Sequence, residues 1–351
     1  MYTRLLAILL LAIAAMPVYA AEVPSLYTAQ VPFDKSADDG REVAYRAALD
    51  VVLLKVSGSD LAGDPEKVEL LFPDPATYVV QFRPGEQDTL WVSFDGRAIE
   101  RTLRQAGQTV WGGDRPLTIV WLAVDWGQGQ REIIGSDDQD RSGDASRSID
   151  RNRLLRERVL DITDRRGLPV VFPLLDVADL QQVSFSDIWG GFDDAVLEAS
   201  KRYDANSILI GRVRVNSHQP DNWRYYLGGQ ERALTGEPEY VIGQVADILA
   251  DEFAIRGNAR VEAVDLTIGG IESVDAYGAV QSILAHISVV DSFAIVEVSG
   301  DTIRYRVEAT GGAPSLGRAL RFNGLTEQND SDEAQPPADS DEARLSFFYS
   351  P

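Results

Sequence analysis

Two apolar runs constrain the fold of this chain more than any other feature. Residues 117–126 read LTIVWLAVDW, and residues 207–213 read SILIGRV. Continuous apolar runs of this length are typical of strands that are buried on both faces. Between them lie a basic helical stretch at about 149–166, the apolar strand LPVVFPLL at 168–175 and a helix at about 191–203. Strands that alternate with helices predict a parallel sheet and an α/β domain.

The chain after the second run predicts an extension of this sheet. The segments NWRYYL and ERALTG read as an antiparallel hairpin, and EYVIGQVADILADEFAIRG reads as a helix that stops at Gly257. We therefore predict a three-layer α/β middle domain over residues 114–257, with an antiparallel hairpin extension. A polar insertion is expected at 127–148.

The segments on either side of the middle domain share one order of elements. Residues 21–113 and 258–326 both read as a strand, a helix, a hairpin of two strands and a closing helix. The pattern R-x-L-R-x-x-G ends both closing helices, at 101–107 and 318–324. Matches in the same topological place predict related modules. The predicted fold class is α/β and α+β, with two small β-α-β-β-α modules flanking the middle domain.

Both ends of the chain predict segments outside these domains. Residues 1–20 combine Arg4, an apolar run and small residues before Ala21, which is typical of a secretory signal peptide. The apolar run is shorter than the roughly 20 residues of a membrane span. We expect a periplasmic protein with no integral membrane span, and peripheral attachment to the envelope is an alternative. Residues 327–351 predict a disordered acidic tail, whose last aromatic residues form either a frayed terminus or a docking motif.

Composition narrows the possible partners and chemistry. The chain has a formal charge of −22 and contains no cysteine. A strongly acidic protein repels phosphate backbones, so nucleic acid is not an expected partner. The absence of cysteine excludes disulfides, thiol catalysis and thiolate metal sites.

The motifs that could bind a cofactor are incomplete. Gly127 and Gly129 follow the first apolar run, but Glu132 stands where a dinucleotide-binding turn needs its third glycine. Its carboxylate would repel a pyrophosphate, so we expect no nucleotide and no cofactor. The two histidines, His218 and His286, fall in different modules. We therefore predict no histidine-based site and assign no catalytic residue.

The best metal candidate is a weak calcium loop in the polar insertion. Asp138, Asp140, Ser142 and Asp144 match its early positions. Ile149 stands at the twelfth position, where a bidentate carboxylate should complete the ligand shell. A solvated insertion is therefore the preferred interpretation, and weak calcium binding is the alternative.

Aromatic and arginine side chains near the ends of middle-domain elements predict an interface, because these residue types commonly anchor protein interfaces. Trp189 and Trp223 are expected to be exposed, Trp189 at a helix boundary and Trp223 at the start of the hairpin. The full set of predicted interface residues is Trp189, Arg212, Arg214, Trp223, Arg224, Tyr225 and Tyr226.

Several segments resemble known bacterial proteins. YDANSILIGRV, NWRYYLGG and VDAYGAVQSILAHISVVDSFAIVEVSGDTIRYRV resemble a secreted family known as domain of unknown function 2066, over nearly all of the chain except the tail. At the fold level, the middle domain is similar to the amino-terminal domain of the translocation protein TolB and to curli-export and synthase-activating envelope lipoproteins. A flanking module together with such a middle domain is also similar to the flagellar T-ring protein. These resemblances imply a non-enzymatic accessory or adaptor protein that binds other envelope proteins. The alternative is a hydrolase or sugar-binding enzyme that acts on envelope polymers.

Overall fold

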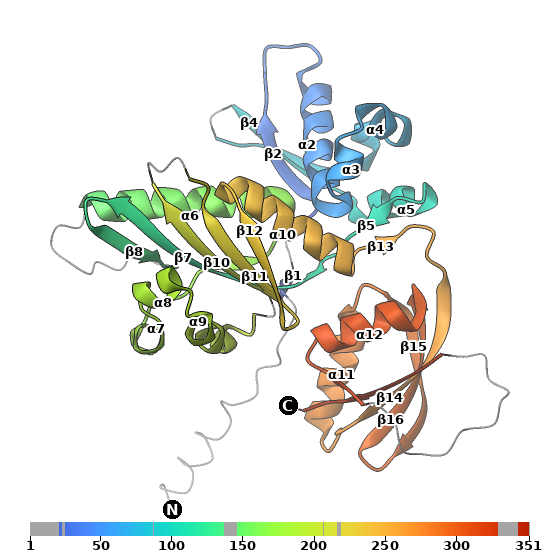
Figure 1. The fold of residues 1–351 in the computed structure, drawn as a ribbon. Coiled ribbons are helices and arrows are strands. Elements are labelled where there is room, and N and C mark those ends of the chain that lie inside the picture. Colours follow the sequence, from blue (N-terminus) through green and yellow to red (C-terminus); the bar gives the residue numbers. More distant parts are fainter. Residues whose placement is uncertain are drawn as a thin grey trace, which may run out of the picture. The chain divides into compact units, whose positions relative to one another are not determined.

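The computed structural model describes residues 21–22, 25–86, 88–136, 146–205, 207–215, 219–328 and 343–350. The chain divides into two compact units, one of residues 21–258 and one that contains residues 259–351 (Figure 1). The fold is mixed α/β, with helices and strands in both units, as the sequence predicts. Within the described residues, no helix combines the length and the apolarity that a membrane crossing needs.

The first module is a three-stranded antiparallel sheet packed against a long helix. Its main elements are β2 (Thr28–Pro32), α2 (Gly40–Ser57), β3 (Val79–Pro84), β4 (Thr89–Phe94) and α5 (Gly96–Gln105). Short helices lie between α2 and β3: α3 (Ser59–Ala62), α4 (Pro65–Leu71) and the 3-10 helix η2 (Pro75–Tyr78). The sheet order is β2-β4-β3. Alternate residues of β4 and one face of α2 form a common core, because a strand buries every second side chain. The predicted order of elements is confirmed.

The middle domain is built on a mixed sheet. Its strands are β7 (Thr118–Gly127), β8 (Gln130–Ile134), β9 (Val170–Val171), β10 (Ser207–Arg214), β11 (Asn222–Leu227) and β12 (Gln230–Thr235). The order is β12-β11-β10-β7-β8, and β9 also pairs with β7. Only the pairs β7–β10 and β7–β9 are parallel.

Two predictions about this sheet need correction. The segment 127–148 does not begin as a polar insertion, because Gly127 and Gly129 form the turn into β8, which pairs with β7. The segment 168–175 contributes only the two-residue strand β9. Its remaining residues lead into a loop that the Asp179 carboxylate holds, as described below.

Helices cover both faces of this sheet and make three layers (Figure 1). One layer contains α6 (Ser146–Arg166) and α10 (Pro238–Phe253). The other contains α7 (Val177–Gln182), α8 (Phe185–Gly190), α9 (Asp193–Ser200) and the 3-10 helix η3 (Lys201–Tyr203). Alternate residues of β7 enter the two cores: Val120 and Leu122 pack toward α6 and α10, and Ile119 and Trp121 pack toward α8 and α9. Burial on both faces is why residues 117–126 form a continuous apolar run.

Gly211, near the end of the second apolar run, makes room for a tryptophan. It lies opposite Trp223 of β11. A Cβ atom at Gly211 would lie 2.6 Å from the Cε3 atom of Trp223 and 2.8 Å from Leu122 Cδ1. The glycine therefore allows the indole ring to pack directly against the β10 backbone, and this position is part of the scaffold.

Short strand pairs connect the first module to the middle domain within residues 21–258. Strand β1 (Ala21–Glu22) pairs with β6 (Asp114–Arg115), and β5 (Thr109–Val110) pairs with β13 (Ile255–Arg256). The Lys55 ammonium group, almost fully buried, donates to the carbonyl oxygens of Ser25 and Thr28 and pairs with Asp164 of α6 at 3.3 Å. These contacts join elements that the sequence assigns to separate domains.

The second β-α-β-β-α module forms the other unit. Its elements are β14 (Val261–Gly269), α11 (Val274–His286), β15 (Val290–Ser299), β16 (Thr302–Thr310), α12 (Gly312–Phe322), β17 (Thr326–Glu327) and β18 (Ala343–Phe348). The order β15-β16-β14 repeats the order β3-β4-β2 of the first module. A register shift also falls near the start of both β3 and β15. The repeated order and the matching bulges support the predicted relation between the modules.

The carboxyl-terminal segment corrects the prediction of a disordered tail over 327–351. Strand β18 pairs in parallel with β14, and β17 pairs with β18. Phe347 is fully buried. The aromatic end of the chain therefore docks in the sheet of its own module, because its apolar side chains offset the cost of ordering it. Most of the acidic stretch, 329–342, lies outside the described residues.

Candidate functional site

Charged side chains gather where the parallel strands β7 and β10 end. In this register Asp125 lies beside Arg214 and Ala123 lies beside Arg212. Arg131 comes from β8, opposite Asp125, and Arg224 comes from β11, opposite Ile210. These positions share the sheet face that carries α7, α8 and α9, because side chains alternate along a strand. The carboxyl ends of parallel strands are where α/β domains most often bind ligands.

Helix α8 places two aromatic rings among these arginines. Phe185 and Trp189 are four residues apart on one face of the helix and stack, with ring centroids 5.1 Å apart and planes 21° apart. The Arg131 guanidinium lies 5.9 Å from the centroid of Phe185, and that of Arg214 lies 5.3 Å from the centroid of Trp189. We call Arg131, Phe185, Trp189 and Arg214 the arginine–aromatic stack. Its planar groups attract one another through cation–π and ring–ring contacts.

The ends of α8 fix the position of the stack. Ser184 and Asp187 form a capping box at the start of the helix. In it, each side chain accepts a hydrogen bond from the backbone N–H of the other residue. The helix ends at Gly191, whose φ of 80° is left-handed. Glycine adopts this conformation without strain, so the chain turns sharply into α9 directly after Trp189.

Beside the stack, Asp193 binds two side chains of β11. Its Oδ2 atom accepts from Arg224 Nη1 at 2.6 Å and from Tyr226 Oη at 2.7 Å. Its Oδ1 atom is buried and has no hydrogen-bond partner in the described part of the chain. Burial and the bond to Asp193 raise the pKa of Tyr226 to about 12, so its phenol is neutral at pH 7.

Arg212 lies between Trp189 and Gly191 and is half-buried. Its Nη1 atom donates to the carbonyl oxygen of Trp189 at 3.4 Å, near the limit of a hydrogen bond. A Cβ atom at Gly191 would lie 2.5 Å from Arg224 Nη2 and 3.7 Å from Arg212 Nη2. The left-handed φ of 80° at Gly191 favours glycine at this turn, which lies against the Arg224 guanidinium.

The structure brings together most of the predicted interface residues but not all of them. Trp189, Arg212, Arg214, Arg224 and Tyr226 lie on the face described above. The remaining two, Trp223 and Tyr225, do not lie on this face, and the expected exposure of Trp223 is wrong.

Trp223 and Tyr225 point to the opposite face of β11 and belong to the core under α6 and α10. Trp223 is 2% exposed and its Nε1 atom donates to the carbonyl oxygen of Gly236 at 3.0 Å. Tyr225 is fully buried, and its hydroxyl accepts from Ser207 at 3.0 Å. Alternation along NWRYYL separates these residues from Arg224 and Tyr226, and this signal is present in the sequence.

Three members of the site were not predicted: Arg131, Phe185 and Asp193. The spacing of Phe185 and Trp189 was a usable signal, because residues four apart share a helix face. Arg131 could not be placed without knowing that β8 pairs with β7.

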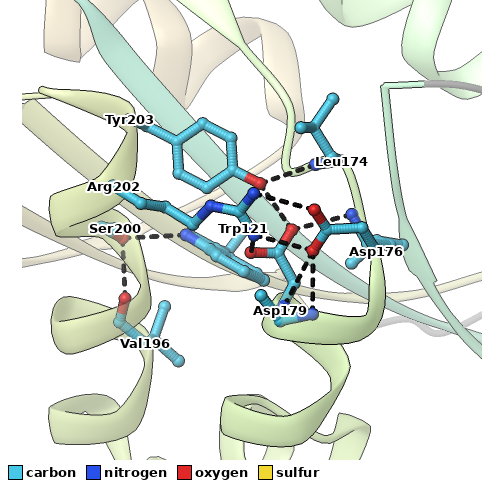
Figure 2. A network of polar contacts seen from close by, with 10 residues as sticks. Trp121, Leu174, Asp176, Asp179, Val196, Ser200, Arg202 and Tyr203 are labelled. Atoms are coloured by element: carbon cyan, nitrogen blue, oxygen red, sulfur yellow. Dashed lines mark hydrogen bonds and ion pairs between the residues drawn. The ribbon is translucent and has the colours of Figure 1, made fainter. Parts of the chain in front are cut away.

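A second polar network lies on the same sheet face and supports the loop after β9 (Figure 2). The Asp179 carboxylate is buried and accepts from Arg202 Nη1 at 2.9 Å, from Tyr203 Oη at 2.5 Å and from the Leu175 N–H at 2.8 Å. Leu175 has a left-handed φ of 51°, which is strained for this residue type. Asp179 therefore holds the loop in a conformation that Leu175 alone would avoid.

Asp176 completes this network as a surface carboxylate. It accepts two hydrogen bonds from Arg202, at 2.7 and 2.8 Å, and caps the start of α7. The bonds from Arg202 and from the Asp179 N–H hold the pKa of Asp176 far below its usual range. Burial and the bond to Asp179 raise the pKa of Tyr203 to about 12. These groups bind one another, as the members of a structural network do.

The structure describes only some of the residues in the metal and histidine predictions. The calcium candidate, Asp138, Asp140, Ser142 and Asp144, lies outside the described residues, and so does His218. His286 is the last residue of α11. In the part of the chain that the structure describes, no cluster of three or more histidine, aspartate or glutamate side chains could hold a metal ion.

Comparison with known proteins identifies one region. Residues 20–112 match a family model described as Domain of unknown function (DUF8605). This corrects the sequence-based resemblance to domain of unknown function 2066, both in the family and in the extent. The matched residues coincide with the first module to within one position at each end. No curated protein and no solved structure matches the chain.

Proposed function

We propose that this protein is a non-enzymatic accessory protein of the bacterial cell envelope, and that it docks other envelope proteins through the arginine–aromatic stack together with Arg212. The observation that carries the proposal is the convergence of two aromatic rings and three arginines on one rigid sheet face. Tryptophan, tyrosine and arginine are enriched at the energetic centres of protein interfaces. Their pre-positioning lowers the entropy cost of binding.

The protonation states around the stack favour docking over proton transfer. The Gly127 N–H and the Arg131 guanidinium hold the pKa of Asp125 below its usual value, so this carboxylate stays ionised. Asp193 is tied to Arg224 and Tyr226. A general acid or base needs a pKa near the working pH, and the pKa of Asp125 is moved away from it.

The sequence supports the location and the class of partner. The signal-like residues 1–20 favour export. The fold-level similarity of the middle domain to TolB and related envelope proteins stays a prediction from the sequence, and it favours binding and assembly.

Photo-crosslinking in the producing bacterium tests this proposal. A benzoylphenylalanine replaces Phe192, which is 67% exposed and follows Gly191 directly. The matched control position is Tyr240, which is 63% exposed on α10 in the opposite helix layer. We expect a discrete adduct with an envelope protein from position 192 alone, and we expect Trp189→Ala with Arg214→Ala to abolish it. Equal adducts at both positions, or adducts that persist in the double variant, would overturn the proposal.

A further inference from the structure

The arginines at the candidate site differ in whether a carboxylate neutralises them. Arg131 pairs with Asp125 at 3.1 Å, and Arg224 pairs with Asp193 at 2.6 Å. In the described part of the chain, no carboxylate oxygen lies within 4.0 Å of the guanidinium nitrogens of Arg212 or Arg214. Among the described residues, the site therefore holds two guanidinium groups without an ion pair within this distance, although the chain carries a formal charge of −22. Asp125 and Asp221 lie near enough to Arg214 to feel its charge, and the Asp221 carboxylate accepts from the Arg214 backbone N–H at 3.0 Å.

The surroundings of these two arginines leave donors for a ligand. Arg212 is half-buried, and one of its N–H groups donates to the Trp189 carbonyl oxygen at 3.4 Å. Arg214 is exposed and lies over the Trp189 ring, 5.3 Å from its centroid. A guanidinium group that stacks on a ring still presents its N–H groups at its edge. Such an edge binds a planar anion through two parallel hydrogen bonds.

The spacing of the two arginines selects the shape of the ligand. They occupy alternate positions on β10, on the same face of the sheet. Alternate residues of a strand are about 6.6 Å apart, because the rise per residue is about 3.3 Å. An extended peptide has the same repeat for side chains on one of its faces. Two carboxylates at positions i and i+2 of such a peptide can therefore meet Arg212 and Arg214 together.

We propose that the partner segment is an extended acidic peptide with carboxylates at alternate positions, which pair with Arg212 and Arg214 while the residue beside them packs on Trp189. This inference deepens the proposed function and rests on it. A polyphosphate or nucleic acid ligand is disfavoured, because its backbone charge continues beyond the two arginines, where the acidic protein repels it, whereas the peptide needs only the two carboxylates that the arginines meet.

Fluorescence anisotropy with three labelled peptides tests the spacing and the charge. The first is Ala-Glu-Ala-Glu-Ala, the second is Ala-Glu-Glu-Ala-Ala with the same charge, and the third is Ala-Gln-Ala-Gln-Ala. We expect the alternating glutamate peptide to bind the full-length protein at least about tenfold more tightly than either of the others. Equal binding of the first two would overturn the alternate-position geometry. Equal binding of all three, or tighter competition by inorganic phosphate than by the first peptide, would overturn the acidic-peptide inference.

Matched variants assign the binding to the two arginines. We expect Arg212→Gln and Arg214→Gln each to weaken binding of the alternating peptide by about tenfold, and lysine at either position to restore only part of it, since lysine lacks the planar fork. Arg232→Gln is the charge-matched control, because Arg232 is exposed on β12 opposite Tyr225, on the other face of the sheet. An equal loss in the Arg232 variant would show a general charge effect and overturn the assignment.

The two proposals fail in different ways. If the Phe192 adduct requires the stack but the alternating peptide does not bind, the docking surface stands and the acidic-partner inference is wrong. If the peptide binds as expected but no adduct forms in the bacterium, the acidic-peptide site stands and the proposed envelope function is wrong.

Discussion

The Nη2 atom of Arg115 donates a hydrogen bond to the backbone carbonyl oxygen of Lys55 at 2.7 Å. The Arg115 side chain is fully buried and also donates to the carbonyl oxygens of Trp111, Gly112 and Gly167 at 2.8 to 2.9 Å. Lys55 lies in the last turn of α2, and Gly167 follows α6. The cation therefore sits at the negative ends of two helices, one from the first module and one from the middle domain.

Replacement of Arg115 should weaken the contacts between the first module and the middle domain. Burial lowers the pKa of Arg115 to about 9, so the guanidinium is still charged at neutral pH. Arg115→Met removes the donors and leaves buried carbonyl groups without partners. We expect the free energy of unfolding of residues 21–258 to fall by about 3 kcal/mol or more, measured by urea denaturation of the full chain. Arg101→Met, an exposed position on α5, should change it by less than about 0.5 kcal/mol. Similar losses in both variants would contradict this role.

Gly211 should not tolerate a methyl group. Gly211→Ala would push the new Cβ atom against Trp223 and Leu122 in a packed core. We expect a destabilisation of about 1 to 3 kcal/mol and an altered tryptophan fluorescence spectrum. Gly113→Ala is the matched control, because nothing lies within 4 Å of a Cβ atom there. Its effect should stay below about 1 kcal/mol. An unchanged unfolding midpoint for Gly211→Ala would show that Trp223 can move aside.

The Asp179 network predicts a large effect from a nearly isosteric substitution. Asp179→Asn replaces a carboxylate that accepts three hydrogen bonds through two oxygens with an amide that can accept at only one atom. We expect a loss of about 3 kcal/mol in thermal or urea unfolding. The exposed residue Asp251 on α10 gives the control, Asp251→Asn, which should be nearly neutral. Comparable stability of the two variants would mean that Leu175 is held by other contacts.

Acid should weaken the same network. The pKa of Asp176 is lower in the folded chain than its usual value of 3.8, chiefly because Arg202 donates to it. The folded state thus binds fewer protons than the unfolded state, so this contribution is present above 3.8 and is lost as the pH falls through the folded pKa. We expect the urea midpoint of the wild type to fall between about pH 5 and pH 2, and we expect Asp176→Asn to show a shallower fall. Parallel pH profiles would contradict the assignment.

The docked carboxyl terminus can be tested at one side chain. Phe347→Ala should destabilise the unit of residues 259–351 by about 3 to 5 kcal/mol, because it removes a fully buried ring from the sheet. Hydrogen exchange of the β14 amides should become faster in this variant. Phe348, which is 38% exposed, provides the control, and Phe348→Ala should cost about 1 kcal/mol. If neither substitution affects exchange in β14, the terminus does not pack there.

The repeated modules show where sequence reasoning is sufficient. Period-two and helical patterns predict the strand, helix, hairpin and closing helix of both modules, because each module buries one sheet face under its own helices. The two sheets nevertheless protect their first strands differently. In the second module, β18 pairs with β14. In the first module, β2 ends in Pro32, which has no N–H, and the carbonyl oxygen of Thr28 on β2 accepts a hydrogen bond from Lys55. Those choices depend on contacts between residues that are far apart in the sequence.

The sequence predicts only part of the candidate site, because the rest depends on contacts between residues that are far apart in the sequence. Trp189 and the arginines of β10 were recognised by residue type and by their place at element ends. The place of Trp223 and Tyr225 near the start of the hairpin predicts the same surface for them, but alternation along β11 turns both side chains into the core. Phe185, Arg131 and Asp193 joined the site only through the packing of α8 and the pairing of β8 and β11.

The sequence by itself determined the periodic elements, the order of elements that recurs in two modules and the α/β character of the middle, because the burial of alternate or helical faces follows from local residue patterns. Only the tertiary structure decided which strands pair at the edges, that the aromatic terminus completes a sheet, and which arginines keep a carboxylate. Those outcomes depend on distances between residues that the chain brings together through folding, and no local pattern records such distances.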